Sequence, residues 1–271
     1  MPDNEPIDLL VVSHGSSLEP ECYRPIDEIA NELLDSPRIN AVSTGFLKQN
    51  PSLRQGWRAL KGPRVVVAPY LASAGFFAER VLPKKLGFPP VEFGKPFEFE
   101  GRQVIYTEAL GTDPALTDIV ETVALEIADG QRGPNPGDTT LVVVGHGTPR
   151  HRHSGKSVHH CVARLSPRGI FRDVRAAFVD EKPFADNILD ECRHGDVVVV
   201  PYFVCDGPHV KTDIPSAFGI SKSIFRAPHT VGAHCIWYAH AIGTRREMIQ
   251  ILANRVEEAA KRYSSPPSSR A

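Results

Sequence analysis

The sequence contains few cysteines and lacks any long apolar run. Its five cysteines are scattered along 271 residues, and no two are spaced as C-x-x-C. This excludes a disulfide framework and a structural zinc cluster, and it favours a reducing compartment, so we expect a cytoplasmic protein. No apolar stretch reaches the roughly 18 residues that span a bilayer. The acidic start, residues 1–6, is unlike a signal peptide. We therefore expect no membrane association.

Strong charge of one sign is also absent from the chain as a whole. The net charge is −1 and the isoelectric point is about 6.8. Basic and aromatic residues do not interleave, so a nucleic-acid partner is not expected. The two halves nevertheless differ: residues 1–132 hold 13 Lys and Arg against 19 Asp and Glu, whereas residues 133–271 hold 18 against 13. Either two abutting domains carry complementary charge, or the basic second half receives an anionic ligand.

The chain repeats itself at a constant offset of 132 residues. The pair His14-Gly15 recurs as His146-Gly147, and the run 65–70 (VVVAPY) recurs as 197–202 (VVVVPY). Many matches in one register indicate two copies of one fold. We expect an N-terminal domain over residues 1–130 and a C-terminal domain over 139–263. A Gly- and Pro-rich linker separates them, and a disordered tail follows at 264–271.

Strands alternate with helices in each half. Residues 140–145 (TLVVVG) form a continuous apolar run ending in glycine, as a buried parallel strand does. Alternation of this kind predicts right-handed crossovers. The predicted fold class is therefore α/β, with two tandem domains, each a four-stranded parallel sheet with helices on both faces. The predicted strands are 9–13, 42–47, 64–70 and 103–107 in the first half and 140–145, 174–179, 197–202 and 235–238 in the second.

Candidate ligand residues follow all four strands of the second half. Ligands bind beyond the carboxyl ends of parallel strands, and the residues placed there are His146, Asp180, His209 with Asp213, and His240. Imidazoles together with a carboxylate suit iron or cobalt. The first copy has Lys48, Phe77 and Val81 where the second has Asp180, His209 and Asp213. We therefore predict a working site in the second copy only.

Two assignments at this site have alternatives. Asp213 is either a metal ligand or the N-cap of a helix that begins at Ile214, with Pro215 at an early position. The segment 150–156 (RHRHSGK) is either an exposed charged loop or a substrate-carboxylate site, because Arg binds carboxylates in a bidentate fork. The predicted substrate-binding residues are Thr148, Arg150, Arg152, Ser154 and Lys156.

Both halves resemble the class II chelatases, the CbiX/SirB-type sirohydrochlorin cobalto- and ferrochelatases, in their long two-domain form. The resemblance lies in H-G-T at 146–148, F-V-D at 178–180 and G-P-H-x-x-x-D-I-P at 207–215. It implies ATP-independent insertion of Co²⁺ or Fe²⁺ into sirohydrochlorin, an octacarboxylate, in cobalamin or siroheme biosynthesis. It also implies that His146 and His209 bind the metal and accept pyrrole protons, assisted by Asp180, where the family usually has Glu. No cofactor beyond the metal substrate is expected.

Two other functions use the same residues. A non-catalytic tetrapyrrole-binding or metal-delivery protein could have this fold without turnover. A histidine phosphatase would also have a histidine after its first strand, but it needs an arginine directly before that histidine, where this chain has Ser13 and Gly145. Because an internal duplication often replaces a homodimer, we expect a monomer.

Overall fold

The computed structural model describes residues 5–130, 133–149, 154–193, 195–221 and 224–263, and the expected tail at 264–271 lies outside them. The chain forms two compact units. Unit 1 comprises the residues up to Leu110 and those from Arg246 onward, and unit 2 comprises Gly111–Arg245. The predicted bounds near residues 130 and 139 therefore mark the sequence repeats, whereas the compact units divide the chain elsewhere.

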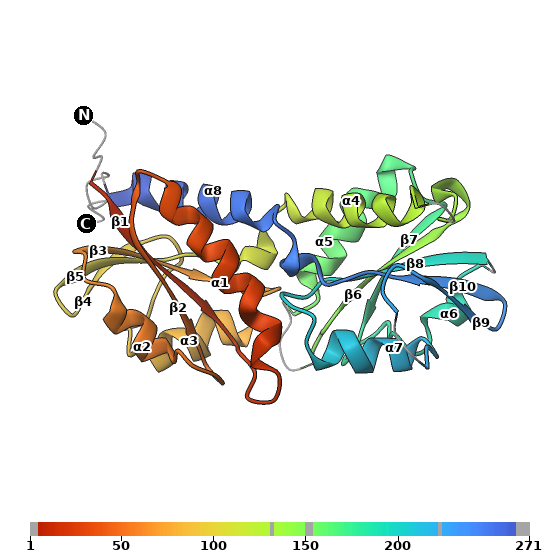
Figure 1. The fold of residues 1–271 in the computed structure, drawn as a ribbon, viewed down its shortest axis with the longest axis horizontal. Helices are drawn as coiled ribbons and strands as arrows, with labels where there is room; N and C mark the ends of the chain where they lie inside the picture. The colour runs from red at the N-terminus through yellow and green to blue at the C-terminus, as the bar shows by residue number, and fades with distance from the viewer. Residues whose placement is uncertain (1–4, 131–132, 150–153, 194, 222–223, 264–271) are drawn as a thin grey trace, which may run out of the picture. The chain divides into compact units, whose positions relative to one another are not determined.

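Each unit is built on one five-stranded, mostly parallel sheet (Figure 1), which confirms the predicted fold class. Unit 1 has the strand order β2-β1-β3-β5-β4, and unit 2 has the matching order β7-β6-β8-β10-β9. The strands of unit 1 are β1 (Ile7–Ser13), β2 (Ile39–Phe46), β3 (Arg64–Pro69), β4 (Pro96–Phe99) and β5 (Arg102–Tyr106). Those of unit 2 are β6 (Thr140–Gly145), β7 (Asp173–Phe178), β8 (Gly195–Pro201), β9 (Pro228–Val231) and β10 (His234–Tyr238).

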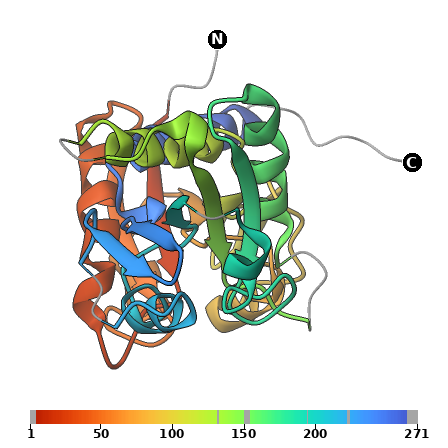
Figure 2. The same ribbon diagram turned by 90° about the vertical axis from the view of Figure 1, so that its right-hand side faces the viewer.

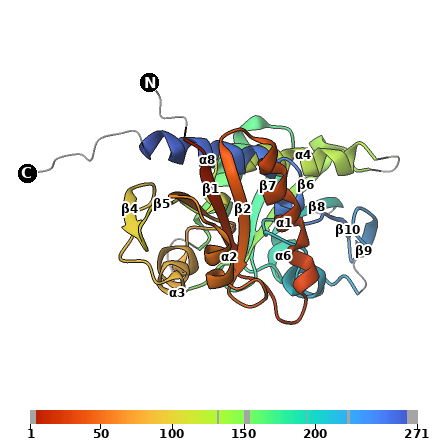
Figure 3. The same cartoon turned by 60° about the vertical axis from the view of Figure 1, so that its left-hand side comes forward.

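The fifth strand of each sheet corrects the predicted number of four. β4 pairs antiparallel with β5, and β9 pairs antiparallel with β10. Figure 3 shows β4 at the edge of its sheet. Both strands have four residues, begin with proline and alternate exposed and half-buried positions. Such a strand has no continuous apolar run, which is the signal that identified the buried parallel strands.

Helices cover both faces of each sheet, as predicted. In unit 1, α2 and α3 pack on one face, and α1 and α8 on the other. In unit 2, α6 and α7 pack on one face, and α4 and α5 on the other (Figure 2). The helices are α1 (Arg24–Asn31), α2 (Leu53–Ala59), α3 (Leu82–Leu86), α4 (Leu116–Ala128), α5 (Lys156–Leu165), α6 (Ile188–Glu191), α7 (Ile214–Ala217) and α8 (Met248–Tyr263).

Burial on both faces explains the apolar strands that position the site. Val142 and Val144 of β6 belong to the core under α6 and α7, and the alternate residues Leu141 and Val143 are also fully buried. A strand covered on both sides cannot alternate apolar and polar residues. Polar side chains are therefore displaced to the strand ends. No helix in the described part of the chain is both long and apolar enough to cross a membrane.

Candidate metal and proton-transfer site

His146 directly follows β6 at the carboxyl edge of the sheet in unit 2. Gly147 has a φ of 69°, a left-handed conformation that glycine adopts at low cost. The Nδ1 atom of His146 lies 2.8 Å from the Gly147 carbonyl oxygen and 3.4 Å from Oδ2 of Asp180. The Asp180 backbone N–H donates to the His146 carbonyl at 2.9 Å, which fixes Asp180 beside the histidine. Adjacent strand ends thus bring the predicted pair together.

His209 and Asp213 lie on a π-helical turn, η7 (His209–Asp213), that precedes α7. The Nδ1 atom of His209 lies 2.6 Å from Oδ2 of Asp213. Asp213 has helical backbone angles and makes no side-chain capping bond. The N-cap interpretation is therefore wrong: the carboxylate binds the imidazole instead. The Tyr238 hydroxyl donates to the Val210 carbonyl in the same turn, at 2.6 Å. Burial raises the pKa of Tyr238, so this donor keeps its proton.

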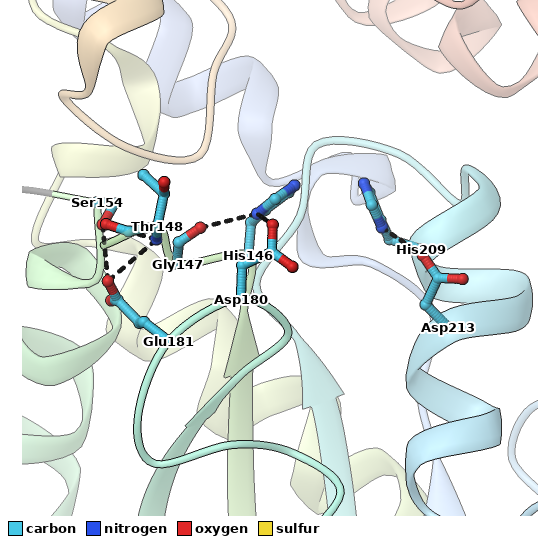
Figure 4. Close-up of polar contacts among 8 residues, drawn as sticks. All are labelled: His146, Gly147, Thr148, Ser154, Asp180, Glu181, His209 and Asp213. Carbon is cyan, nitrogen blue, oxygen red and sulfur yellow. Dashed lines mark hydrogen bonds and ion pairs between the residues drawn. The ribbon is translucent and has the colours of Figure 1, made fainter. Parts of the chain in front are cut away.

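The two imidazole rings are neighbours (Figure 4). Their centroids are 4.6 Å apart with an interplanar angle of 75°, and the Phe203 ring lies 6.4 Å from His146 and 6.0 Å from His209. Carbonyl and carboxylate oxygens only accept hydrogen bonds, so Nδ1 of each ring must carry the proton. In the neutral state each Nε2 therefore has a free lone pair. The site thus combines two lone-pair donors with an aromatic wall.

The carboxylates of Asp180 and Asp213 contact the imidazole rings of His146 and His209 at Nδ1. In the described residues, no three His, Cys, Asp or Glu side chains come together as a metal-binding group. The predicted ligand set of His146, His209, Asp180 and Asp213 is thus arranged as two histidine–carboxylate pairs. Carboxylates placed in this way orient a histidine and fix which ring nitrogen carries the proton.

A hydrogen-bond network organises the loop that follows His146. The Thr148 backbone N–H donates to Oε2 of Glu181 at 3.0 Å, and the Ser154 hydroxyl lies 3.1 Å from the same atom (Figure 4). A side chain at Gly147 would collide with Glu181. Thr148 and Ser154 therefore help to fold the loop, and their contact with substrate stays a prediction. Lys156 is exposed at the start of α5. The predicted Arg150 and Arg152 lie outside the described residues.

Unit 1 preserves this geometry with different chemistry. The Nδ1 atom of His14 lies 2.9 Å from the Gly15 carbonyl, as in His146 and Gly147. The Phe77 ring stands edge-on to His14, with centroids 5.1 Å apart at 81°. Phe77 thus occupies the place of His209 on the matching π-helical turn, η3 (Phe77–Val81). The structure supports the residue correspondence that the sequence repeat suggested.

His240, the fourth strand-end residue, forms a pair of its own. Its Nδ1 lies 2.6 Å from Oδ2 of Asp206, and its ring stacks on Phe225 with centroids 3.9 Å apart. It lines a cavity of about 170 Å³ together with Arg226 and Arg245. Sequence reasoning did not identify the partner Asp206 or the aromatic wall Phe203. The strand-end position of both residues, after β8, was the available signal.

Comparisons with known proteins agree with this architecture. The sequence model of the CbiX family matches residues 8–127 and again 140–259. A probable sirohydrochlorin cobaltochelatase of Halobacterium salinarum is 30% identical over 267 residues, which cover 93% of this chain and 91% of that protein. A Deinococcus radiodurans multi-domain protein with structural similarity to chelatases superposes with a TM-score of 0.76 at 23% identity and 94% coverage. This chain spans 55% of that protein's length. The sirohydrochlorin chelatase SirB of Bacillus subtilis subspecies spizizenii, in complex with cobalt, gives 0.66 at 16% identity, covering 94% of this chain and 96% of its own.

Proposed function

Because the chain belongs to the CbiX family, we propose that it catalyses the insertion of a divalent metal ion, Co²⁺ or Fe²⁺, into sirohydrochlorin. The reaction would serve cobalamin or siroheme biosynthesis and would need neither ATP nor a resident cofactor. The observation that carries this proposal is the pair His146 and His209. Their rings are 4.6 Å apart, and each has an acceptor oxygen at Nδ1.

Metal insertion exchanges two pyrrole protons for one dication, so the site must deliver a metal ion and remove protons. The Nε2 lone pairs of His146 and His209 can bind the metal ion or accept the pyrrole protons. An imidazole suits proton transfer because its unperturbed pKa is close to neutral pH. Once Nε2 has taken a proton, the ring is a cation, and Asp180 or Asp213 stabilises it through Nδ1. The two protons leave through these bases while four ring nitrogens bind the metal.

The metal is a substrate here, so weak and open binding is an advantage. Two imidazoles leave most of the coordination positions of Co²⁺ or Fe²⁺ available to the ring nitrogens. Sirohydrochlorin has eight carboxylates, and the basic second half of the chain, with Lys156 exposed at the start of α5, suits an anionic ligand. The Phe203 ring offers an apolar wall for the macrocycle beside the two histidines.

An anaerobic absorbance assay tests the proposal, with sirohydrochlorin and Co²⁺ or Fe²⁺ as substrates. His209→Phe installs the residue that unit 1 has at this place, and we expect it to lower the insertion rate by at least about 100-fold, the usual minimum effect of a general base. His229→Phe on the edge strand β9 is the control, because it makes the same chemical change away from the site, and it should leave the rate unchanged.

Two results would contradict the proposal. Wild-type protein that binds sirohydrochlorin without accelerating insertion would be a tetrapyrrole carrier or metal-delivery protein. Full activity in His209→Phe would exclude the histidine pair of unit 2, and His14→Ala would then test unit 1.

A further inference from the structure

Unit 1 exposes two adjacent phenylalanines where unit 2 has Pro208 and His209. Phe76 is 57% exposed and Phe77 is 44% exposed. Burial of a phenylalanine side chain stabilises a fold, and each of these residues leaves about half of its surface in solvent instead. Single exposed apolar residues are common on soluble proteins, but adjacent exposed aromatics suggest a ligand surface.

Their place in the fold favours a ligand. Both residues lie beyond the carboxyl end of β3, the edge at which parallel α/β sheets bind ligands. Phe77 packs edge-on against His14, in the arrangement that His209 and His146 have in unit 2. The site geometry has thus been kept, while its metal-binding and proton-accepting groups have been replaced by a phenyl ring.

The residue that replaces Asp180 points to the same kind of ligand. It is Lys48, an exposed residue whose backbone N–H donates to the His14 carbonyl at 2.9 Å. A cation at the end of β2 would repel a metal ion but attract carboxylates. The turn that bears Phe77 is also held in place, because the Tyr106 hydroxyl donates to the Ala78 carbonyl at 2.8 Å. Binding to Phe77 would therefore order little of the backbone.

We propose that Phe76, Phe77 and Lys48 form a platform that binds the tetrapyrrole itself, which rests on the proposed function for the identity of the ligand. The Phe77 ring contacts the flat conjugated face of the macrocycle, Phe76 adds apolar surface beside it, and Lys48 pairs with one of the peripheral carboxylates. Loss of one aromatic side chain on which a flat heterocycle stacks weakens binding about 5- to 150-fold. The first copy would thus contribute ring binding without metal chemistry.

Equilibrium titration with a metal-free octacarboxylate porphyrin tests the platform, followed by absorbance and fluorescence. We expect Phe77→Ala to weaken binding about tenfold and Phe76→Ala/Phe77→Ala to weaken it further. Phe77→Tyr should bind the porphyrin about as tightly as the wild type does, because tyrosine keeps the aromatic ring. Lys48→Glu should also weaken binding, most clearly at low salt. Leu34→Ala is the matched control: Leu34 is an apolar residue of unit 1 that is 49% exposed, and it lies in the turn before β2 and not at the carboxyl end of a strand.

The proposal is overturned if the phenylalanine variants bind the porphyrin as tightly as Leu34→Ala does, or if wild-type protein does not bind it. Melting temperatures of all variants identify any loss of folding, and the tyrosine variant distinguishes loss of the ring from loss of structure. Failure of the proposed function is a separate result. A protein whose platform variants lose porphyrin, but whose wild type inserts no metal, would keep this inference and lose the enzymatic one.

Discussion

At the residue scale, the chemistry of the site depends on which nitrogen of each imidazole ring is hydrogen-bonded within the protein. Both histidines face an acceptor oxygen through Nδ1, at 2.8 Å for His146 and 2.6 Å for His209. The same Nδ1 contact occurs at His14, whose neighbour Phe77 cannot act as a base. The residue at position 77 or 209 therefore decides whether a copy has a second imidazole beside its strand-end histidine.

Asp213→Asn tests the supporting carboxylate. The amide oxygen of asparagine can still accept a hydrogen bond from His209, but it cannot neutralise the imidazolium. We expect insertion to fall about 10- to 100-fold, as for other residues that support a metal-binding histidine, with little loss of thermal stability. Steady-state insertion rates and melting curves provide the measurement. Asp190→Asn, in α6 and exposed, should match the wild type, and equal rates in both variants would exclude a role for Asp213.

At the element scale, the π-helical turns η3 and η7 position the residue that differs between the copies. Each turn receives a hydrogen bond from the hydroxyl of a buried tyrosine, Tyr106 in unit 1 and Tyr238 in unit 2. Burial raises the pKa of both tyrosines, so both hydroxyls keep the proton that they donate at neutral pH. Irregular turns of this type often occur at functional sites.

The tyrosine pair offers a matched experiment. Tyr106→Phe and Tyr238→Phe each leave one buried carbonyl without its donor, so each should lower the free energy of unfolding by about 1–2 kcal/mol. Tyr238→Phe should also reduce metal insertion, because it loosens the turn that holds His209. Tyr106→Phe should leave the catalytic step unchanged. Denaturant unfolding and single-turnover insertion distinguish the effects, and equal catalytic losses in both variants would show that η7 has no special role.

Helix α4 is held in unit 2 by an ion-pair cluster around Glu126. Arg245 donates two hydrogen bonds to this carboxylate, at 2.7 and 2.9 Å, and Arg226 a third at 3.1 Å. The hydrogen bond from Arg245 is the largest of the effects that hold the pKa of Glu126 below its usual 4.5. A carboxylate whose pKa is lower in the folded state than in the unfolded state stabilises the fold at pH values above its unfolded pKa. This stabilisation is lost as the pH falls through the folded-state pKa.

Glu126→Gln should therefore be less stable than the wild type at neutral pH, and the difference should disappear in acid. The side chain is 34% exposed, so we expect a difference of about 0.5–1 kcal/mol at pH 7. Urea unfolding between pH 7 and pH 3 measures it. Glu258→Gln, at the corresponding place on α8, is the control. A stability gap that stays constant with pH would contradict an electrostatic role.

At the scale of the whole molecule, sequence repeats and compact units do not coincide. α4 ends the first repeat but belongs to unit 2, where Arg168 pairs with Asp118 and Glu121 of this helix. α8 ends the second repeat but belongs to unit 1, where the Tyr263 hydroxyl donates to the Val65 carbonyl of β3 at 2.7 Å. Each sheet is thus covered by the last helix of the other repeat.

Fragments of the chain should reveal this exchange. Residues 133–271 correspond to the second repeat, but they lack α4 and carry α8 without its sheet. Each apolar side chain that loses its cover costs about 1.5–3 kcal/mol of stability. Summed over the buried face of one helix, this cost is comparable to the total stability of a typical domain, about 5–15 kcal/mol. We expect this fragment to aggregate, whereas residues 111–245 should fold. Size-exclusion chromatography and near-ultraviolet circular dichroism provide the test. A cooperatively folding, monomeric 133–271 fragment would contradict it. That the full chain is itself a monomer stays a prediction.

The sequence by itself determined the duplication, the α/β class and the copy that has the histidines. These follow from local signals: apolar runs, a constant offset, and the identity of residues 77 and 209. The tertiary structure decided what the sequence left open or missed. Asp213 contacts His209 within one π-helical turn, and Phe203 lies beside the two histidines. Helix α4 of the first repeat belongs to unit 2, and helix α8 of the second repeat belongs to unit 1. An apolar helix face shows that a helix is buried but not on which sheet, and a carboxylate near a helix start does not show which group it contacts. Both questions are settled by partners distant in sequence, which only folding brings into contact.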